Sequence, residues 1–446
     1  MGNNENRQIV EPSILAGFME LLPAEQILFN SMLETIRKSY ESFGFVPVDT
    51  PVIERAEVLL AKSGGDTAKQ VYRFNKGDND LALRFDLTVP LARYVSMHYG
   101  ELTFPFRRYH IGKVYRGEKP QKGRFREFYQ CDIDIVGNGT LSIYNDAEVA
   151  GVIYNTFRAL DLGDFTIMIN NRKLLSVFFQ SYGIGDPTEV LRSVDRLDKI
   201  GEAGVKKELF DLGLTEEAVA AAIGLASMSG SPADIIAKLK MLGIENELFV
   251  KGLEELEAVS GAISAYGVPE EFFKLNLKIA RGLDYYTGTV YETFLNAHPE
   301  LGSICSGGRY DELASNYTKQ TLPGVGISIG FSRLFYQLRE SGLLGEAGTR
   351  PAASTSKVLV VPMDDTVEYA LKVAAVVRET GIPVETYLNG GKMGKKLGYA
   401  DKLGIKYVMV CGETEREEGS VMLKDMTTGN QETVKLADFK TVLNIS

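Results

Sequence analysis

Arginines recur in short segments that also contain glycine or tyrosine. One segment reads Arg281-Gly-Leu-Asp-Tyr-Tyr-Thr-Gly, a second reads Ser306-Gly-Gly-Arg-Tyr-Asp311, and a third, Gly324–Arg333, is rich in glycine. A guanidinium group pairs bidentately with phosphate oxygens, and glycine lets the backbone approach a ligand. With Arg116 and Arg124, these segments predict converging arginines around a polyphosphate, and the Gly-Gly pair after Ser306 is expected to form a turn.

Basic residues are concentrated in one stretch of an otherwise acidic chain. Residues 104–126 contain eight Lys or Arg and one acid, Glu118, so this stretch carries 8 − 1 = +7. The whole chain of 446 residues carries 49 − 59 = −10. Because local patches matter more than net charge for binding an anion, the stretch predicts an anion site. A solvated basic hairpin is the alternative interpretation.

Several familiar chemistries do not fit the sequence. The chain has no GxxxxGK[ST] segment, so an ATP site here would lack a P-loop. Gly326-Ile-Ser328-Ile-Gly330 matches the hydrolase pattern GxSxG, but that fold needs a histidine after the serine, and all three histidines precede Ser328. Cys305 fails as a nucleophile for the same reason. Asp132 and Asp134 could serve a glycosidase, but nearby arginines are expected to keep both ionised.

Cysteine and histidine are scarce. The three cysteines are far apart and form no CxxC pair, which predicts neither a disulfide framework nor a zinc site. This usage favours a reducing cytoplasm. No apolar run approaches ~18 residues, and residues 1–12 lack the apolar core of a secretory signal, so no membrane association is expected.

Hydrophobic periodicity predicts the elements that must position these residues. Apolar residues at spacings near 3.6 predict a helix over residues 18–43. Around the polar loop GEKPQKG, two extended segments predict a long-looped antiparallel hairpin. In the second of them, Cys131, Ile133 and Ile135 alternate with the two aspartates. Further strands are expected at residues 71–74, 81–85, 289–295 and 326–329.

The order of these patterns predicts an α+β protein of three parts. Residues 1–171 and 267–341 are expected to form one domain on an antiparallel β-sheet, interrupted by a helical insertion at residues 172–266. Within the insertion, Thr215 and Ser231-Pro232 are N-cap signals. Residues 342–356 have the composition of a linker. Residues 357–446 alternate strand and helix, which predicts a separate three-layer α/β domain.

At this level of detail the sequence resembles the class II aminoacyl-tRNA synthetases, and specifically the histidyl-tRNA synthetase family. GFVPVDTPVIE, KVYRGEKPQKGRFREFYQCDIDIVG and GVGISIGFSRL resemble motifs 1, 2 and 3 of that class. ARGLDYYTGTVYE and CSGGRYD resemble the two histidine-specific motifs. LRFDLTVPLARY resembles the family's amino-acid-binding segment, and LGYADKLGIKYVMVCG resembles its anticodon-binding domain.

The resemblance implies a function, partners and a set of site residues. A histidine--tRNA ligase activates L-histidine with ATP and Mg²⁺ to histidyl-adenylate and pyrophosphate, then transfers it to the 3′ end of tRNA(His); a cytoplasmic homodimer joined through motif 1 is implied. The implied catalytic residues are Arg116 and Arg281. The implied ATP contacts are Arg116, Glu118, Arg124, Phe128 and Arg333. The implied histidine contacts are Asp86, Thr88, Arg116, Gln130, Asp134, Arg281, Tyr285 and Tyr286. The implied tRNA contacts are Gln121 and Lys122. No protein metal ligand is implied.

One alternative function belongs to the same fold. A catalytically inactive paralogue binds histidine as the regulatory subunit of ATP phosphoribosyltransferase. Such paralogues typically lose the arginine of the histidine motif and the C-terminal domain. This chain retains Arg281, Tyr286 and residues 357–446, which favours the enzyme.

Overall fold

The structure of the protein is a computed structural model. It describes residues 10–61, 69–119, 121–185, 187–194, 196–279, 285–344, 352–363 and 365–439. The chain divides into two units, Met1–Met19 with Glu34–Leu343, and Glu20–Leu33 with Leu344–Ser446. In the part of the chain that is described, none of the helices combines the length and the apolar character needed to span a membrane.

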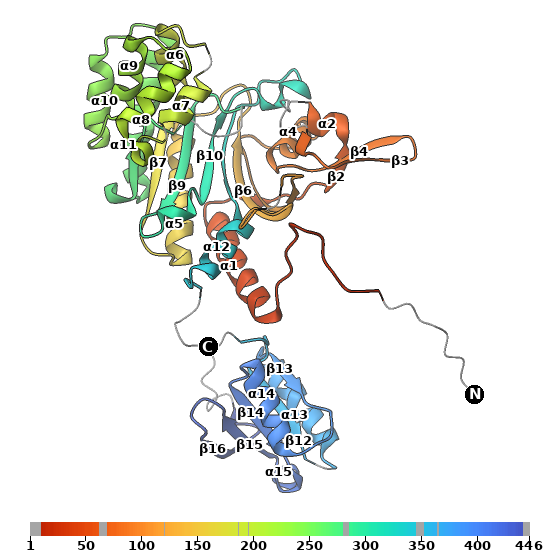
Figure 1. Ribbon diagram of the computed structural model, residues 1–446. Helices are drawn as coiled ribbons and strands as arrows, with labels where there is room; N and C mark the ends of the chain where they lie inside the picture. The colour runs from red at the N-terminus through yellow and green to blue at the C-terminus, as the bar shows by residue number, and fades with distance from the viewer. Residues whose placement is uncertain are drawn as a thin grey trace. The chain divides into compact units, whose positions relative to one another are not determined.

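An eight-stranded sheet organises the first unit, in the order β1-β5-β6-β11-β10-β9-β7-β8 (Figure 1). The strands are β1 (Val46–Pro47), β5 (Phe106–Tyr115), β6 (Glu127–Val136), β7 (Phe165–Asn171), β8 (Phe273–Leu275), β9 (Thr289–Leu295), β10 (Cys305–Tyr310) and β11 (Gly324–Ile329). β1 runs parallel to β5 and β8 parallel to β7, whereas all neighbours between β5 and β7 are antiparallel. The predicted antiparallel sheet is confirmed, with one short parallel strand at each edge.

The β5–β6 hairpin sorts its residues onto two faces. Cys131 and Ile133 are completely buried on the apolar face of β6, while Asp132 and Asp134 lie on the opposite face, where a cavity opens. This alternation follows from the two-residue period of a strand. The hairpin and its two faces were therefore predictable from the sequence.

Three helices accompany the sheet: α1 (Pro23–Ser42), α5 (Tyr144–Leu160) and α12 (Phe331–Glu340). α5 contacts β7 and β11, and α12 contacts β6. In α1, the Tyr40 hydroxyl donates a hydrogen bond to the carbonyl oxygen of Cys131 at 3.1 Å. The helix predicted over residues 18–43 begins at Pro23, since proline is tolerated in a first turn, where its missing N–H costs nothing.

A second, three-stranded sheet with the order β2-β4-β3 projects from this unit (Figure 1). Its elements and the neighbouring helices are β2 (Ile53–Arg55), α2 (Ala56–Leu60), β3 (Arg73–Lys76), β4 (Asn79–Leu83) and α4 (Thr88–Met97). The described residues of the unit also contain the 3₁₀ helices η1 (Ser264–Tyr266), η2 (Glu270–Phe272), η3 (Pro299–Leu301) and η4 (Leu313–Asn316).

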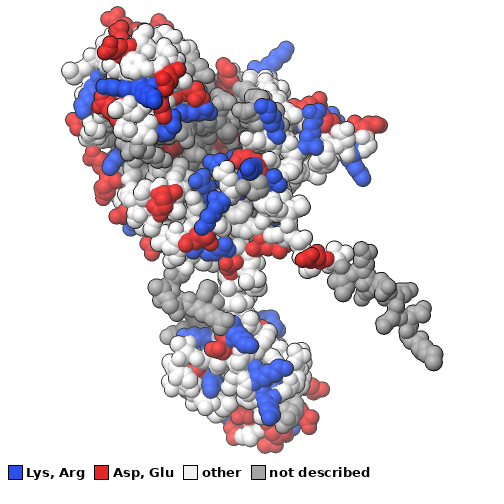
Figure 2. All heavy atoms as spheres, viewed as in Figure 1, with Lys and Arg blue, Asp and Glu red and all other residues white. Residues whose placement is uncertain are grey.

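Between β7 and β8 the chain is helical, as predicted. The helices are α6 (Arg172–Ser181), α7 (Thr188–Val194), α8 (Leu197–Asp211), α9 (Glu216–Ala226), α10 (Pro232–Met241) and α11 (Glu247–Ile263). Thr215 and Ser231 accept the N-cap hydrogen bonds expected of them. α11 ties the group to the sheet by packing on α5, α6 and β7. Basic and acidic side chains are interspersed over this helical surface (Figure 2).

The second unit is a five-stranded sheet with the order β13-β12-β14-β15-β16. Its elements are β12 (Val358–Pro362), α13 (Val367–Glu379), β13 (Val384–Thr386), α14 (Met393–Leu403), β14 (Tyr407–Cys411), α15 (Glu413–Glu418), β15 (Ser420–Asp425) and β16 (Gln431–Lys435). Alternate residues of β12 pack against α13 on one face and α14 on the other. The predicted three-layer α/β domain is confirmed. Residues 345–351 of the predicted linker lie outside the described residues.

The predicted turn at Ser306-Gly-Gly is wrong, because these residues lie inside β10. A Cβ on Gly307 would come within 2.1 Å of the carbonyl oxygen of Gly326, and a Cβ on Gly308 within 2.6 Å of the carbonyl oxygen of Thr289. Glycine is required here by the close approach of both neighbouring strands, and no chain reversal is involved.

A buried ion pair joins β10 to α5. Both Nη2 and Nε of Arg309 donate to the carboxylate of Asp146, with the shortest distance 2.6 Å, and its Nη1 and Nη2 also donate to the carbonyl oxygens of Leu141 and Ser142. The side chains of Arg309 and Asp146 are 6% and 0% exposed. The pair is therefore buried and held by several hydrogen bonds.

Replacing Arg309 by methionine leaves the carboxylate of Asp146 buried without its partner. We expect Arg309→Met to lower the free energy of unfolding by about 3–5 kcal/mol, measured by urea denaturation. Arg192→Met is the matched control, because Arg192 and Glu189 are each 59% exposed and such a pair contributes only about 0–1 kcal/mol. Equal losses in the two variants would contradict this account.

Candidate active site

A cavity of about 400 Å³ opens on the polar face of β6, a size suited to a small-molecule ligand. Eleven of the residues that the sequence analysis predicted line it: Asp86, Thr88, Arg116, Glu118, Arg124, Phe128, Gln130, Asp134, Tyr285, Tyr286 and Arg333. The predicted Arg281 lies outside the described residues. Gln121 and Lys122 do not line the cavity. The other lining residues include Asp132, Tyr310 and Ser328.

Asp134 is held from both sides at the base of the cavity. Nη2 of Arg108 lies 2.6 Å from one carboxylate oxygen, and the hydroxyl of Tyr310 donates to the other at 2.8 Å. Arg108 is completely buried. Each carboxylate oxygen keeps a further lone pair, so Asp134 can still accept a hydrogen bond from a ligand.

Two glycines of β11 make this contact possible. β11 lies between β6, which carries Asp134, and β10, which carries Tyr310. A Cβ on Gly324 would come within 2.3 Å of the Tyr310 ring, and a Cβ on Gly326 within 2.4 Å of the Asp134 carboxylate. Any larger residue at either position would block the path of Tyr310 across the strand.

Asp132 is a second buried carboxyl group in the cavity. Its oxygen Oδ1 has no hydrogen-bond partner among the described residues. Burial raises the pKa of Asp132 to about 7, and that of Asp134 to about 6, although Arg108 opposes both shifts. The expectation that arginines keep both groups ionised is therefore wrong for Asp132, because desolvation of the charged form outweighs the attraction.

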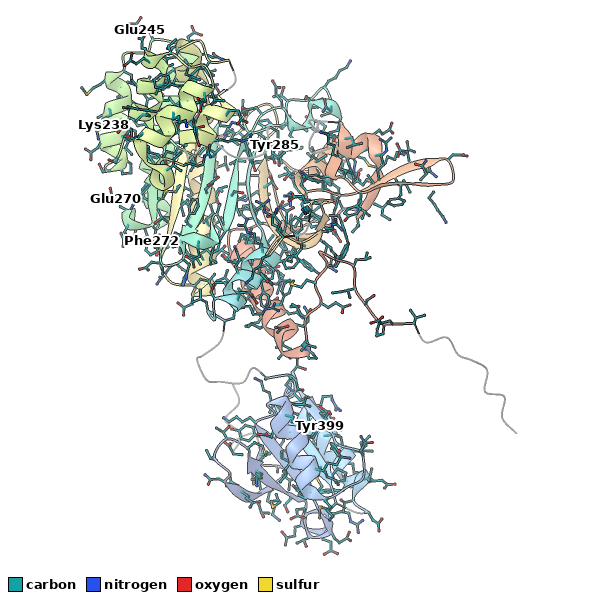
Figure 3. The ribbon with its side chains drawn as sticks, viewed as in Figure 1. Lys238, Glu245, Glu270, Phe272, Tyr285 and Tyr399 are labelled. Carbon is teal, nitrogen blue, oxygen red and sulfur yellow. The ribbon has the colours of Figure 1, made fainter. Side chains whose placement is uncertain are left out.

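Asp86 and two tyrosines close the same end of the cavity. The N–H of Val89 donates to Asp86 at 3.0 Å, at the start of α4, and burial raises the pKa of the Asp86 carboxyl. Tyr285, labelled in Figure 3, packs with Tyr286 against the apolar core beside α4. This end combines three carboxyl groups with aromatic walls, which suits a small cationic ligand carrying an aromatic ring.

Arginines line the same cavity. The guanidinium of Arg116 lies between the rings of Phe85 and Phe128, 4.4 and 5.1 Å from their centroids. Burial lowers the pKa of Arg333, and the nearby charge of Arg124 lowers it further. Cations that repel one another across a cavity are stabilised by a bound polyanion.

Three other arginines of the predicted anion site form ion pairs within the protein. Arg309 pairs with Asp146, Arg108 with Asp134 and Arg107 with Glu148. Of the basic residues in 104–126, Arg116 and Arg124 line the cavity. The sequence analysis predicted that residues 104–126 and the Ser306–Asp311 segment contribute to a phosphate site. Of their basic residues, Arg116 and Arg124 are in a position to do so. Residue type alone does not reveal which arginines have ion-pair partners within the protein.

No second catalytic apparatus accompanies the cavity in the described part of the chain. His110 is buried outside it, with Nε2 2.9 Å from Asp49, and burial with Arg108 and Arg84 lowers its pKa to about 3. Among the described residues, no cluster of three His, Cys, Asp or Glu side chains could hold a metal ion. The three cysteines are free and buried.

Three residues that line the cavity, Asp132, Tyr310 and Ser328, were not predicted as binding residues, and the sequence carries a signal for the first two. Asp132 shares the face of Asp134 by strand alternation, and Tyr310 belongs to the CSGGRYD motif. Ser328 stood out only as part of a hydrolase pattern. In the structure it accepts a hydrogen bond from Gln130 at 2.6 Å, a contact between distant segments that no local pattern predicts.

The chain matches two family models. The model described as histidyl-tRNA synthetase matches residues 17–334, and the model described as anticodon binding domain matches residues 357–444. Among curated relatives, a histidine--tRNA ligase of Clostridium tetani is 58% identical over 97% of this chain and 98% of its own. One of Finegoldia magna is 46% identical over 96% and 98%.

Solved structures agree with the family models. The crystal structure of histidyl-tRNA synthetase from Nostoc sp. PCC 7120 superposes with a TM-score of 0.88 at 42% identity, covering 98% of this chain and 99% of that one. An ATP phosphoribosyltransferase regulatory subunit/histidyl-tRNA synthetase from Bacillus halodurans superposes with a TM-score of 0.73 at 22% identity, over 91% of this chain and 99% of that one. The latter likeness shows the fold alone. The chain belongs to the histidyl-tRNA synthetase family.

Proposed function

We propose that this protein is a histidine--tRNA ligase that joins histidine to ATP in the cavity and transfers it to tRNA(His). The observation that carries the proposal is one cavity lined both by carboxyl groups (Asp86, Asp132, Asp134) and by arginines (Arg116, Arg124, Arg333). Histidine brings an ammonium group and an imidazole to the carboxyl groups, and ATP brings its phosphates to the arginines. The histidine carboxylate and the α-phosphate then meet between them.

At the histidine end, each polar group has a proposed role. Asp134 accepts a hydrogen bond from one imidazole nitrogen, and Tyr286, with Tyr285 beside it, faces the other. Asp86, Thr88 and Gln130 hold the ammonium and carboxylate groups. Because buried polar groups left unpaired are costly, a site built to hydrogen bond both ring nitrogens rejects apolar amino acids of similar size.

At the ATP end, the proposed contacts are electrostatic and aromatic. Arg116 and Arg281 grip the α-phosphate, and Arg333 lies near the γ-phosphate. Glu118 and Arg124 belong to the loop that covers the nucleotide, and Phe128 stacks on adenine. Mg²⁺ fits this site as an ion carried by the phosphates, since it usually keeps its waters and takes only one or two carboxylates from protein.

The proposed reaction needs no protein nucleophile. A carboxylate oxygen of histidine forms a bond to the α-phosphorus, and the bond from that phosphorus to the bridging oxygen breaks as pyrophosphate leaves. Charge grows on the phosphoryl oxygens, so positioning and fixed guanidinium groups account for catalysis. The terminal hydroxyl of tRNA then attacks the adenylate carbonyl carbon, and AMP leaves.

The partners extend beyond the cavity. We propose that Gln121 and Lys122 approach the acceptor end of tRNA, and that the second unit binds its anticodon loop, where unstacked bases can be read. We also propose a homodimer through the motif 1 segment, where Val46 and Ile53 are each 48% exposed. The free, buried cysteines support a reducing cytoplasm as the compartment.

ATP–pyrophosphate exchange with each of the twenty amino acids tests the proposed function. We expect exchange with histidine alone. Arg116→Lys should lower its rate by about 100-fold, because a lysine lacks the bidentate fork that stabilises the growing charge. Arg107→Lys is the matched control, since Arg107 pairs with Glu148 away from the cavity. Histidine binding without exchange in the unaltered protein would instead favour the regulatory paralogue.

Removing the charge of Lys122 tests the proposed tRNA contact. Lys122 is 74% exposed and pairs with Glu340. We expect Lys122→Ala to lower kcat/KM for tRNA charging by about fivefold through loss of one phosphate contact, with unchanged ATP–pyrophosphate exchange. Lys38→Ala, at a side chain 69% exposed and paired with Glu34, should alter neither rate. A parallel loss of exchange in Lys122→Ala would place this residue in activation instead.

A further inference from the structure

Ser328 stands at the junction of two polar residues of β6. It lies directly opposite Asp132 in the antiparallel pairing of β11 with β6, so both side chains project from the same face. Gln130 is two residues before Asp132 and reaches the same hydroxyl. Gln130 and Asp132 are 8% and 2% exposed. The three side chains therefore form a short chain of polar groups that is largely removed from water.

The hydrogen bonds in this chain have a defined direction. Nε2 of Gln130 donates to Oγ of Ser328 at 2.6 Å. A serine hydroxyl has one proton, and that proton is left to donate to the carboxylate of Asp132, whose hydrogen bond with Ser328 lowers the pKa of Asp132 against the effect of burial. Above its pKa of about 7, Asp132 is ionised and its carboxylate only accepts hydrogen bonds. In that form Asp132 sets the direction of the Ser328 hydroxyl, which in turn sets the orientation of the Gln130 amide.

The orientation leaves one atom of Gln130 for a ligand. Its carbonyl oxygen Oε1 is buried and has no partner among the described residues, and Gln130 lines the same cavity as Asp86 and Thr88. In the opposite orientation, the amide would present its N–H donors to the cavity. An ammonium group has donors alone, so it requires the carbonyl.

We propose that Ser328 and Asp132 are positioning residues that hold the Gln130 amide with its carbonyl oxygen toward the ammonium group of bound histidine. The inference rests on the proposed function and adds to it a role for Asp132 and Ser328, two lining residues without an assigned ligand contact. Neither is a catalytic residue, because each acts through Gln130. Without the hydrogen bonds from Gln130 to Ser328 and from Ser328 to Asp132, the Gln130 amide can rotate. For part of the time it then presents its N–H groups to the ammonium group and repels it.

Binding of histidine and of imidazolepropionate separates this role from a purely structural one. Imidazolepropionate is histidine with its ammonium group replaced by hydrogen. By isothermal titration, we expect Ser328→Ala to weaken histidine binding by about tenfold, as for loss of one hydrogen bond to a charged group. Imidazolepropionate binding should change by less than about twofold. Ser328→Thr, which keeps the hydroxyl, should bind both ligands as the unaltered protein does.

A double-mutant cycle completes the test. Asp132→Ala should cause the same selective loss, and the Ser328→Ala, Asp132→Ala double variant should lose no more than either single variant, as expected for coupled residues. Additive losses, or an unchanged histidine affinity in Ser328→Ala, would overturn the positioning role; a loss confined to Asp132→Ala would mean that Asp132 contacts the ligand itself. If Asp132→Ala does not fold, the comparison of Ser328→Ala with Ser328→Thr still tests whether the Ser328 hydroxyl orients Gln130. Histidine-dependent exchange by the unaltered protein tests the proposed function separately.

Discussion

A carboxylate removed from water stays charged only where cations and hydrogen-bond donors replace its hydration, and the cavity is built around one such group, Asp134. Arg108 on the neighbouring strand and Tyr310 two strands away supply that replacement. Tyr310 reaches Asp134 only because Gly324 and Gly326 leave its path open. The buried charge of Asp134 therefore depends on the strand order, on the glycines of β11 and on the long β5–β6 hairpin.

The same cost of burial acts on both kinds of charge that line the cavity. The pKa values of Asp86, Asp132 and Asp134 are raised because no full set of partners compensates for the lost water. The pKa values of Arg116 and Arg333 are lowered for the same reason. A ligand with a cationic side and an anionic side compensates for both. Histidine and ATP together have this character, and in the proposed reaction they are joined in this cavity.

Much of this arrangement was predictable because strand alternation is a strong local signal. It placed Asp134 on the polar face of β6 and the apolar residues on the other, and the glycine-rich segments marked the strands where backbone and ligand come close. Partners in space were not predictable. Arg108, Arg116 and Arg309 are alike in sequence, yet Arg108 and Arg309 serve buried ion pairs and Arg116 lines the cavity. The pKa of Asp132 and its link through Ser328 to Gln130 likewise depend on burial and on contacts between distant segments.

A crystal structure with the sulfamoyl analogue of histidyl-adenylate tests the central claim most directly. The analogue carries the histidine side chain and the adenosine, with a sulfamoyl group in place of the α-phosphate. We expect an imidazole nitrogen within hydrogen-bond distance of Asp134, the ammonium group near Asp86 and Gln130, and the sulfamoyl group against Arg116. An imidazole lying among Arg116, Arg124 and Arg333, or an analogue bound outside the cavity, would contradict the account.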